Sequence, residues 1–503
     1  MKSLLLALAG GVVSFLAFPP FGPGWLIVGG VALFLWSLRA AESRRQGVWV
    51  GFAYGLVFFA GFMWWLSQLE LIALILIPVQ ALFFAVFGWW LAGHRDKSSP
   101  TWILLAVGGW ALMEVIRYHF PVGGLEWGAA GYALSDNLYT RLPAAAVGTS
   151  GLTVIVVMIA GLIAIALTRD WDRRMAWGVP VIGLALFGSI PSIVYRFDTD
   201  VQRVAIVQGS TPCPFEHCPP NERLRTYQQH LALSETIEAG SVDLVVWPEG
   251  STGSTNADPV NNPEIGEAIG AQARRIGAPM LVGGDRTVDD THWVNANVYF
   301  DADGVIVGEY RKQHPVPFGE YIPWRPVFEW IPALDRVPRD MIPGDGPVVF
   351  EGGLGSVISF EGGFSRYAFE TRRAGADVLV VNTNNASYGL TPASDIWMGM
   401  TRMRAVELGI PVIHSAVTGK STVMDYQGSF ETTTALGTQE IYEGTYGSTT
   451  ATLYSFTGNL LMYGAALLGF LAWHRSRALV GSGAMQSRSS SMESNSQQLI
   501  EED

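Results

Sequence analysis

Three short segments each place a residue able to do chemistry directly after an apolar, strand-like run. The first, LVVWPEGST, carries Glu249, and the second, GEYRKQHPVPFGEYIPW, carries Lys312 and Glu320. The third, LGSVISFEGGFSRYAFE, reaches Ser359 and Glu361 before a helical pattern begins. A carboxylate, an ammonium group and a hydroxyl suit a general base, an oxyanion stabiliser and a nucleophile. For Glu249, a turn glutamate that faces water is the plainer interpretation.

Lysine is scarce in this chain, which makes Lys312 unusual. The sequence holds 32 basic residues, of which only Lys2, Lys97, Lys312 and Lys420 are lysines. A lysine kept among arginines suggests a site for a compact charge, which suits oxyanion stabilisation better than a planar guanidinium does. Lys420 lies between two strand-like runs and is interpreted as structural. Glu320 either orients Lys312 and closes the site or is a loop charge.

Ser359 lies where a strand-like run turns into a helix. Such a turn presents its side chain outward and brings helix-terminal amides near a developing oxyanion. The surrounding residues do not match G-x-S-x-G, and no histidine–aspartate pair is evident. A serine hydrolase with a Ser-His-Asp triad is therefore disfavoured.

The three segments belong to a stretch, from Arg203 to Tyr446, in which β-rich runs alternate with amphipathic helical runs. That alternation is typical of a layered α/β domain, whose chemistry usually lies at strand ends. The predicted strands are 204–208, 244–247, 280–283, 296–300, 305–310, 356–360, 378–382 and 412–416. The predicted helices are 221–239, 262–276, 364–374 and 393–408.

The rest of the chain is far more apolar and predicts a membrane protein. A bilayer crossing needs about 20 apolar residues. Seven such stretches precede the α/β domain, at 4–18, 24–38, 48–66, 71–91, 102–116, 147–167 and 177–194, and an eighth follows it at 453–473. A cleaved signal peptide plus one helix is the alternative for the first two, but Phe18, Pro19 and Pro20 do not form a cleavage site.

The sequence thus predicts a polytopic helical membrane domain of about eight transmembrane helices joined to an α/β domain. The expected divisions are seven helices in 1–195, the α/β domain in 196–450, the eighth helix in 451–475 and a disordered tail in 476–503. The tail is rich in serine and has no apolar periodicity.

Positive charges predict the orientation, because lysine and arginine are retained on the cytoplasmic side. The second, fourth and sixth loops and the end of the last helix contain Arg39, Arg44, Arg45, Arg95, Lys97, Arg169, Arg173, Arg174, Arg475 and Arg477. The other loops contain only Arg117 and Arg141. Both termini are therefore expected in the cytoplasm, and the α/β domain is expected outside it.

The remaining composition narrows the range of partners. The net charge is -12, and no basic cluster lies on a helical pattern, which argues against nucleic acid as a partner. The two cysteines, Cys213 and Cys218, are too few for a disulfide framework or an iron–sulfur centre. In an extracytoplasmic loop they form a local disulfide or remain free thiols. No fourth ligand joins them and His217 in a zinc site, so no metal is predicted.

The order glutamate, lysine, nucleophile inside an α/β domain resembles the nitrilase superfamily with its Glu-Lys-Cys triad. About eight membrane helices narrow the resemblance to the apolipoprotein N-acyltransferase family. The similarity covers nearly the whole chain apart from the tail, because FPPFG, VQGS, WPEGST, VPFGEYIP, SFE, NTNNASYG and RMRAVELG occur in the family's order. The resemblance implies an αββα sandwich, the nitrilase-like carbon-nitrogen hydrolase domain, beside the membrane helices.

The resemblance also implies an acyltransferase of lipoprotein maturation in the bacterial plasma (inner) membrane. Its nucleophile takes an acyl chain from a phospholipid and passes it to the N-terminal amine of a diacylglyceryl-modified apolipoprotein, without a metal or soluble cofactor. Glu249 would be the general base, Lys312 the oxyanion stabiliser and Ser359 the residue at the nucleophile position. Glu320 and Glu361 would support the site.

The resemblance assigns a further set of residues to mobile loops that admit lipid from the bilayer. For each of them alone, packing on the domain is an equally good interpretation. The set is Phe318, Tyr321, Trp324, Tyr388 and Trp397.

The chain departs from the family at the nucleophile, because Ser359 stands where a cysteine belongs. A thiol ionises with a pKa of about 8.5, whereas a serine hydroxyl needs a strong adjacent base, and glutamate is a weak one. An acyl-serine oxyester is also less reactive toward an amine than a thioester. Three interpretations stay open: a slow serine enzyme, a silent lipoprotein- or lipid-binding homologue or scaffold, and an engineered nucleophile knockout.

Overall fold

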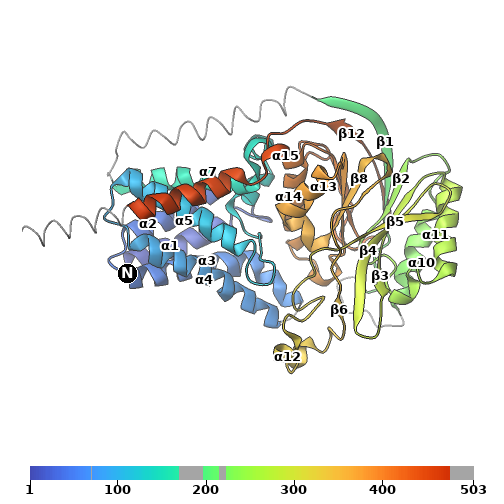
Figure 1. Ribbon diagram of the computed structural model, residues 1–503, viewed down its shortest axis with the longest axis horizontal. Coiled ribbons are helices and arrows are strands. Elements are labelled where there is room, and N and C mark those ends of the chain that lie inside the picture. The colour runs from blue at the N-terminus through green and yellow to red at the C-terminus, as the bar shows by residue number, and fades with distance from the viewer. Residues whose placement is uncertain (70, 169–195, 214–221, 476–503) are drawn as a thin grey trace, which may run out of the picture.

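The computed structural model describes residues 1–69, 71–168, 196–213 and 222–475. A bundle of apolar helices forms one half, and a two-sheet α/β domain forms the other (Figure 1). Helix α14 (Ala393–Leu408) lies between them, and its buried face shares one apolar core with the bundle. The predicted seventh membrane segment, 177–194, and the predicted tail, 476–503, lie outside the described residues.

The helices of the first half follow the predicted apolar stretches. They are α1 (Lys2–Phe15), α2 (Leu26–Arg39), α3 (Arg44–Met63), α4 (Leu76–Ala92), α5 (Ser99–Arg117) and α7 (Ala144–Thr168), and residues 460–475 form a further helix. Four described segments are long and apolar enough to cross a membrane: Arg44–Gln68, Leu71–Ala92, Ser99–Arg117 and Ala144–Thr168. Helices α1 and α2 have 14 residues each and rise about 21 Å, less than a hydrocarbon core of about 30 Å.

Helices α3 and α4 pack closely because glycines line their contact. Gly47, Gly51 and Gly55 recur every fourth residue along one face of α3. A Cβ atom on Gly51 would lie 2.0 Å from the carbonyl oxygen of Phe84, so a larger residue would push the helices apart. In a bilayer, where lipid is as apolar as the side chains, such close packing is a main source of helix association.

The α/β domain contains two sheets. The larger has the order β12-β1-β2-β3-β4-β5, with β6 paired to β4, and the smaller has the order β11-β10-β9-β8-β7. The larger sheet consists of β1 (Phe197–Gln208), β2 (Leu244–Trp247), β3 (Met280–Thr287), β4 (His292–Phe300), β5 (Ile306–Arg311), β6 (Asp340–Met341) and β12 (Glu440–Thr449). The smaller consists of β7 (Val349–Phe350), β8 (Leu354–Ile358), β9 (Val378–Thr383), β10 (Val412–Ala416) and β11 (Thr422–Met424).

Helices cover the outer face of each sheet, which gives an αββα sandwich (Figure 1). Helices α10 (Arg223–Ser234) and α11 (Pro263–Ile276) cover the larger sheet, and Trp247 and Ile269 belong to the core beneath them. Helices α13 (Ser365–Arg373) and α14 cover the smaller sheet. Apolar side chains such as Val246 and Val380 fill the space between the sheets.

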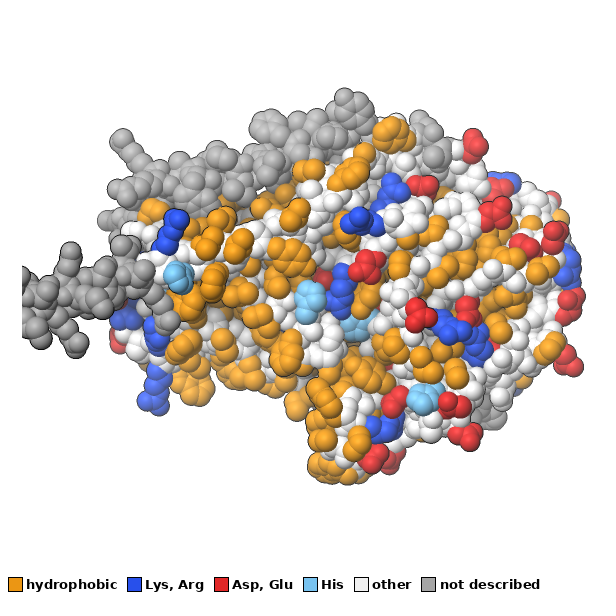
Figure 2. Space-filling model, viewed as in Figure 1, with side chains coloured by type: hydrophobic (Ala, Val, Ile, Leu, Met, Phe, Trp, Pro, Cys, Tyr) orange, Lys and Arg blue, Asp and Glu red, His pale blue; other side chains and the backbone are white. Residues whose placement is uncertain are grey.

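The surface separates by chemistry between the two halves. Hydrophobic side chains cover the helical half, and most acidic side chains lie over the α/β half (Figure 2). The loop between β5 and β6 carries the short helix α12 (Arg325–Phe328) and protrudes beside the bundle (Figures 1 and 2). Trp324, Val327 and Trp330 of this loop expose 63%, 59% and 75% of their surface, so the loop presents apolar groups next to the helical half.

Candidate active site

Glu249, Lys312 and Ser359 all follow strand ends, as their sequence predicts. Strands β2, β5 and β8 end two, one and one residues before them, respectively. Strands β2 and β8 run parallel to their neighbours β3 and β9, so the carboxyl ends within each sheet lie at one edge. The side-chain amide of Asn382, near the end of β9, donates to the Trp247 carbonyl at 3.1 Å. This hydrogen bond joins the two sheets at the edge that carries the site.

The centre of the site is one buried ammonium group held by two carboxylates. The Nζ atom of Lys312 donates to Glu320 Oε1 at 2.6 Å and lies 3.4 Å from Glu249 Oε1. The second oxygen of Glu320 accepts from the backbone N–H of Val316 at 2.7 Å, which fixes the carboxylate that holds the lysine. Glu320 therefore orients Lys312 instead of standing free in a loop.

Lys312 remains charged despite its burial. Its side chain is 1% exposed, and burial disfavours the ammonium, but the carboxylates of Glu320 and Glu249 outweigh this effect and raise the pKa of Lys312 above its ordinary value. A lysine in that state supplies positive charge to an oxyanion and does not donate its proton near neutral pH.

Asn295 of β4 links the base to the lysine, although it is not among the predicted site residues. Its side-chain Nδ2 donates to Glu249 Oε1 at 2.8 Å, and its backbone carbonyl accepts from the backbone N–H of Lys312 at 2.9 Å. Asn295 is 3% exposed. The signal that points to it is an asparagine pair, with Asn297, inside the otherwise apolar run HWVNANVYF. Buried polar residues in such a strand need partners and so indicate a site.

Ser359 has a strained backbone. Its φ is +49°, in the left-handed region that disfavours residues with a Cβ by about 1–2 kcal/mol. It begins the short 3-10 helix η8 (Ser359–Gly363), directly after β8. Strain of this kind persists where the surroundings hold the residue firmly, and it is common at reactive positions.

Glu361 provides much of that hold. The residue is fully buried, and its Oε2 accepts from the Ile358 N–H and from the Tyr310 hydroxyl, each at 2.7 Å. The first bond closes the turn around Ser359. Burial raises the pKa of the Glu361 carboxyl to about 7, although both donors oppose the rise.

The other oxygen of Glu361 reaches the lysine segment. Its Oε1 accepts from the backbone N–H groups of Gln313 and His314, the latter at 2.9 Å. These two residues directly follow Lys312. One carboxylate thus connects the turn that carries Ser359 to the segment that carries Lys312.

The helical half packs directly on the Ser359 turn. The ring of Phe360 lies 5.4 Å from the ring of Trp127 in an edge-to-face contact. The backbone N–H of Ser365 donates to Glu126 at 3.0 Å, and both residues are buried. The position of the turn therefore depends on both halves of the molecule.

Four of the five residues assigned to lipid-admitting loops lie on loops or short turns. Phe318 and Tyr321 are half-buried, and Trp324 is 63% exposed, all in the loop between β5 and β6. Tyr388 is half-buried, and its ring lies 4.9 Å from that of Trp65 in the helical half.

Trp397 differs from the expectation. It lies within α14 and is 1% exposed, because its ring packs edge-to-face against Trp127 at 5.2 Å. Trp397 is a core residue of the contact between the two halves, not a loop residue. Its helical position, already predicted within 393–408, makes packing the better interpretation.

The described residues offer no metal site. Those residues contain no group of three or more His, Cys, Asp or Glu side chains placed to hold a metal. Cys213 is half-buried, and Cys218 lies outside the described residues.

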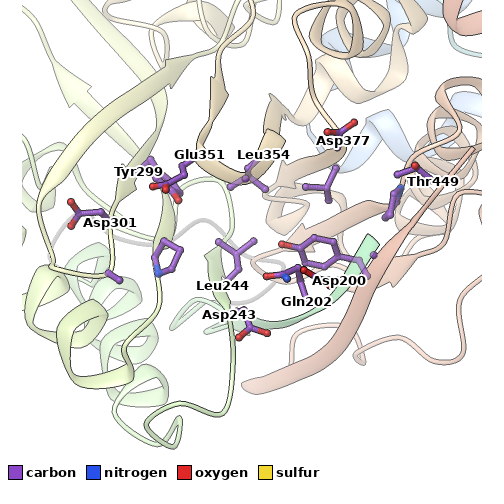
Figure 3. Close-up of a pocket in the computed structure, with 17 residues that line it drawn as sticks. Asp200, Gln202, Asp243, Leu244, Tyr299, Asp301, Glu351, Leu354, Asp377 and Thr449 are labelled. Carbon is purple, nitrogen blue, oxygen red and sulfur yellow. The ribbon is translucent and has the colours of Figure 1, made fainter. Parts of the chain in front are cut away.

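An acidic cleft of about 550 Å³ lies at the opposite end of the sandwich, where β2, β8 and β9 begin (Figure 3). It contains none of the triad residues. Its acidic lining residues are Asp200, Asp243, Asp301, Glu351 and Asp377.

Family models match both halves of the chain. A family model described as Apolipoprotein N-acyltransferase N-terminal domain matches residues 10–162, and one described as Carbon-nitrogen hydrolase matches residues 203–456. An apolipoprotein N-acyltransferase of Photobacterium profundum is 28% identical over 452 residues, which cover 84% of this chain and 85% of that protein. One from Ralstonia nicotianae is 29% identical over 500 residues, which cover 92% and 91%.

Among solved structures, a carbon-nitrogen hydrolase from Helicobacter pylori G27 is similar to 49% of this chain and 89% of its own, with 19% identity and a TM-score of 0.37. The two family models together span most of the sequence, and the second alone covers half of it. The chain belongs to the apolipoprotein N-acyltransferase family, with a carbon-nitrogen hydrolase domain joined to membrane helices.

Proposed function

We propose that this chain transfers an acyl chain from a membrane phospholipid to the N-terminal amine of a diacylglyceryl-modified lipoprotein. The observation that carries the proposal is the buried Glu249–Lys312–Glu320 cluster, which is bonded through Glu361 to the turn of Ser359. A reaction on lipid also accounts for the packing of that turn against apolar helices.

In the first half-reaction, the Ser359 hydroxyl attacks the carbonyl carbon of a phospholipid ester. Its proton passes to the Glu249 carboxylate as the carbon–oxygen bond forms. The tetrahedral oxyanion is stabilised by the Lys312 ammonium group, which is held for that purpose by Glu320. Collapse expels the lysophospholipid alkoxide, which takes the proton from Glu249 and leaves an acyl ester on Ser359.

In the second half-reaction, the lipoprotein amine attacks the acyl carbon. Glu249 accepts a proton from the amine, the carbon–nitrogen bond forms, and Lys312 again stabilises the oxyanion. The bond to the Ser359 oxygen then breaks, and that oxygen regains a proton from Glu249. Both half-reactions are expected to be slow in this chain, because a serine hydroxyl is a weaker nucleophile than a thiol and an oxyester is attacked by amines more slowly than a thioester.

The loop between β5 and β6 suits the entry of lipid. The loop protrudes beside the helical half at α12 (Figure 1), and its Trp324 is exposed, while Glu320 of the same loop is bonded to Lys312. Phe318 and Tyr321 lie on either side of Glu320 in the sequence. We assign to them, and to Tyr388 beside Trp65, contact with the acyl chain of the donor.

The proposed orientation has the α/β domain outside the cytoplasm of a bacterial cell, in a multi-pass plasma membrane protein with both termini inside. Two arginines depart from the charge rule, and each has a structural role that supports this view. Arg117 is fully buried and bonds Glu114 at 2.6 Å. Arg141 donates to the Gln427 carbonyl of the α/β domain at 2.7 Å. Neither is a free charge that would mark a cytoplasmic loop.

The test is an assay of purified protein in detergent with a phospholipid and a synthetic diacylated lipopeptide. Mass spectrometry should detect a slowly formed triacylated peptide and an acyl adduct on Ser359. Glu249→Gln, which keeps the shape but removes the base, should abolish both. Product that does not exceed that of Glu249→Gln would contradict the proposal and favour a silent binding homologue.

A further inference from the structure

Asp285, a residue without a role so far, lies on the face of β3 that carries the site. In the antiparallel pair of β3 and β4, Asp285 is directly opposite Asn295, whose side chain donates to Glu249. Directly opposed residues on neighbouring strands project to the same face of a sheet. Asp285 therefore projects to the face where Glu249 is bound.

A second observation on the same strand agrees with this placement. A Cβ atom on Gly283 would lie 2.8 Å from the Cα atom of Glu249, so that face of β3 is turned toward the base. Side chains two residues apart on a strand share a face. Asp285, two residues after Gly283, is thus beside the Glu249 segment by an argument independent of the β4 pairing.

The site has more acceptors than donors. Lys312 is bonded to Glu320 and Glu249, and among the described residues Asp285 forms no ion pair. Because a carboxylate only accepts, the donor of Asn295 must face Glu249, and its oxygen Oδ1 points elsewhere. That oxygen is buried and has no hydrogen-bond partner among the described residues. A buried acceptor without a protein donor marks a position where an ordered water or a ligand can donate a hydrogen bond.

The charge of the site also favours a ligand that donates hydrogen bonds, and in particular a cationic one. Three carboxyl groups, of Glu249, Asp285 and Glu320, surround one ammonium group. Burial raises the pKa of the Asp285 carboxyl to about 7, and Glu249 and Glu320 add to the rise, although Lys312 and Arg223 oppose it. A ligand that brings both positive charge and several N–H donors would relieve the repulsion and satisfy the free acceptor. A primary ammonium group has both properties.

We infer that Asp285 and the Oδ1 atom of Asn295 form a subsite for the primary amine of the acyl acceptor, next to the base Glu249. The inference rests on the proposed function. The bound ammonium first loses one proton to water, and the resulting amine attacks the acyl carbon. As the new carbon–nitrogen bond forms, Glu249 accepts the second proton, and it passes this proton to the serine oxygen as the carbon–oxygen bond to Ser359 breaks.

The ethanolamine headgroup of a phospholipid carries the same chemistry as the acceptor amine. The acceptor is favoured because its nitrogen must reach the base, and Asn295 is bonded to that base. The headgroup nitrogen does not react, and a phosphate separates it from the glycerol ester. The experiment therefore compares the two sources.

The first arm measures binding in detergent, without a donor, of a fluorescent diacylated lipopeptide with a free or an acetylated N-terminus. The full-length protein should prefer the free amine by about tenfold, the contribution of a charge-assisted hydrogen bond. Asp285→Asn should reduce that preference to less than about twofold. Asp290→Asn, at the exposed tip of the same hairpin, should keep it.

The second arm measures lysophospholipid release from ethanolamine and choline phospholipids, with thermal unfolding as a check on folding. Asp285→Asn should leave the ratio of the two rates unchanged, and a selective loss with the ethanolamine lipid would overturn the assignment to the acceptor. Equal binding of free and acetylated peptide to the unsubstituted chain would overturn the subsite itself. Selective binding without triacylated product would support the subsite and contradict the proposed function.

Discussion

The carboxylate of Glu361 accepts a hydrogen bond at 2.7 Å from the backbone N–H of Ile358, three residues earlier, and so closes the turn that holds Ser359 between them. The backbone of Ser359 is strained, with a φ of +49°, and a hydrogen bond that closes the turn helps to hold it in that conformation. The same carboxylate bonds the N–H of His314, two residues after Lys312. Glu361 is thus a positioning residue that sets the nucleophile relative to the oxyanion stabiliser.

Replacement Glu361→Gln should lower both stability and activity. Four donors surround the two oxygens, and the new NH₂ group would leave two of them unpaired. Each unpaired buried donor costs about 1–2 kcal/mol, so unfolding in detergent should become easier by about 2–4 kcal/mol. Thermal unfolding and the acylation rate measure the two effects. Glu370→Gln, an exposed change on α13, serves as the control. Unchanged activity in Glu361→Gln would rule out the positioning role.

Ser359→Cys should accelerate product formation by at least about tenfold, because a thiol is the stronger nucleophile and a thioester the better acyl donor. The matched change Ser359→Gly should abolish the reaction without loss of stability, since glycine adopts a φ of +49° without the Cβ clash. The rate of product formation, measured by mass spectrometry, and the unfolding temperature test these two expectations. A glycine variant that still forms product would exclude Ser359 as the nucleophile.

Strand ends explain why much of the site could be predicted from the sequence. Glu249 and Ser359 follow apolar runs whose buried strands, Leu244–Trp247 and Leu354–Ile358, leave a clear hydrophobic signature. Strand β12, Glu440–Thr449, has no such signature because it is an edge strand with a partly exposed, polar pattern. It was not predicted, although it pairs with almost the whole of β1.

Residues that depend on strand register could not be predicted. Asn295 joins the site only because β4 pairs with β3 and places its side chain toward Glu249, and Asp285 follows from the same pairing. A single sequence does not determine which residues face each other across strands. Trp397 shows the opposite error, since the family resemblance assigned it to a lipid-admitting loop, whereas contact with the helical half buries it.

Two acidic residues of the contact between the halves should respond very differently to neutralisation. Glu407 accepts from the Thr149 N–H at 2.6 Å and bonds Arg404 at 3.0 Å, with both charged side chains buried. Glu407→Gln would leave a buried charge without its counterion, which costs about 3–5 kcal/mol. Asp136 bonds Arg402 at 2.8 Å but is 45% exposed, so Asp136→Asn should cost about 1 kcal/mol or less. Equal losses of thermal stability would contradict this account.

Buried histidines should make the fold sensitive to acid. Burial lowers the pKa of His314 to about 3 and those of His230 and His414 to about 4. An unfolded histidine titrates near pH 6.5, so between about pH 6.5 and 4 the unfolded chain binds more protons than the folded one. The histidines should therefore lower stability as the pH falls through this window, by up to about 1.4 kcal/mol per pH unit for each, whereas Glu361 and Asp285, whose pKa values are raised to about 7, act in the opposite direction.

Thermal unfolding between pH 7 and pH 5 tests this dependence. His414→Gln removes one titrating group and should flatten the slope, even where it lowers stability at pH 7. His292→Gln is the control, because His292 is 44% exposed beside Asp289. If the pH dependence of thermal stability is as steep in His414→Gln as in the unsubstituted chain, His414 does not contribute to the acid sensitivity.

Labelling of single cysteines tests the orientation. A side-chain N–H of Arg39 donates to the Lys97 carbonyl at 3.0 Å, so the two positively charged loops lie at the same end of the bundle. The proposed topology places that end in the cytoplasm. In a background with Cys213→Ser and Cys218→Ser, Lys97→Cys should react with an impermeant maleimide only after the membrane is opened. Reduced Cys213 of the unsubstituted chain should react in intact spheroplasts. Labelling of Lys97→Cys in intact spheroplasts would contradict the proposed orientation, because the positively charged loops would then lie outside the cytoplasm.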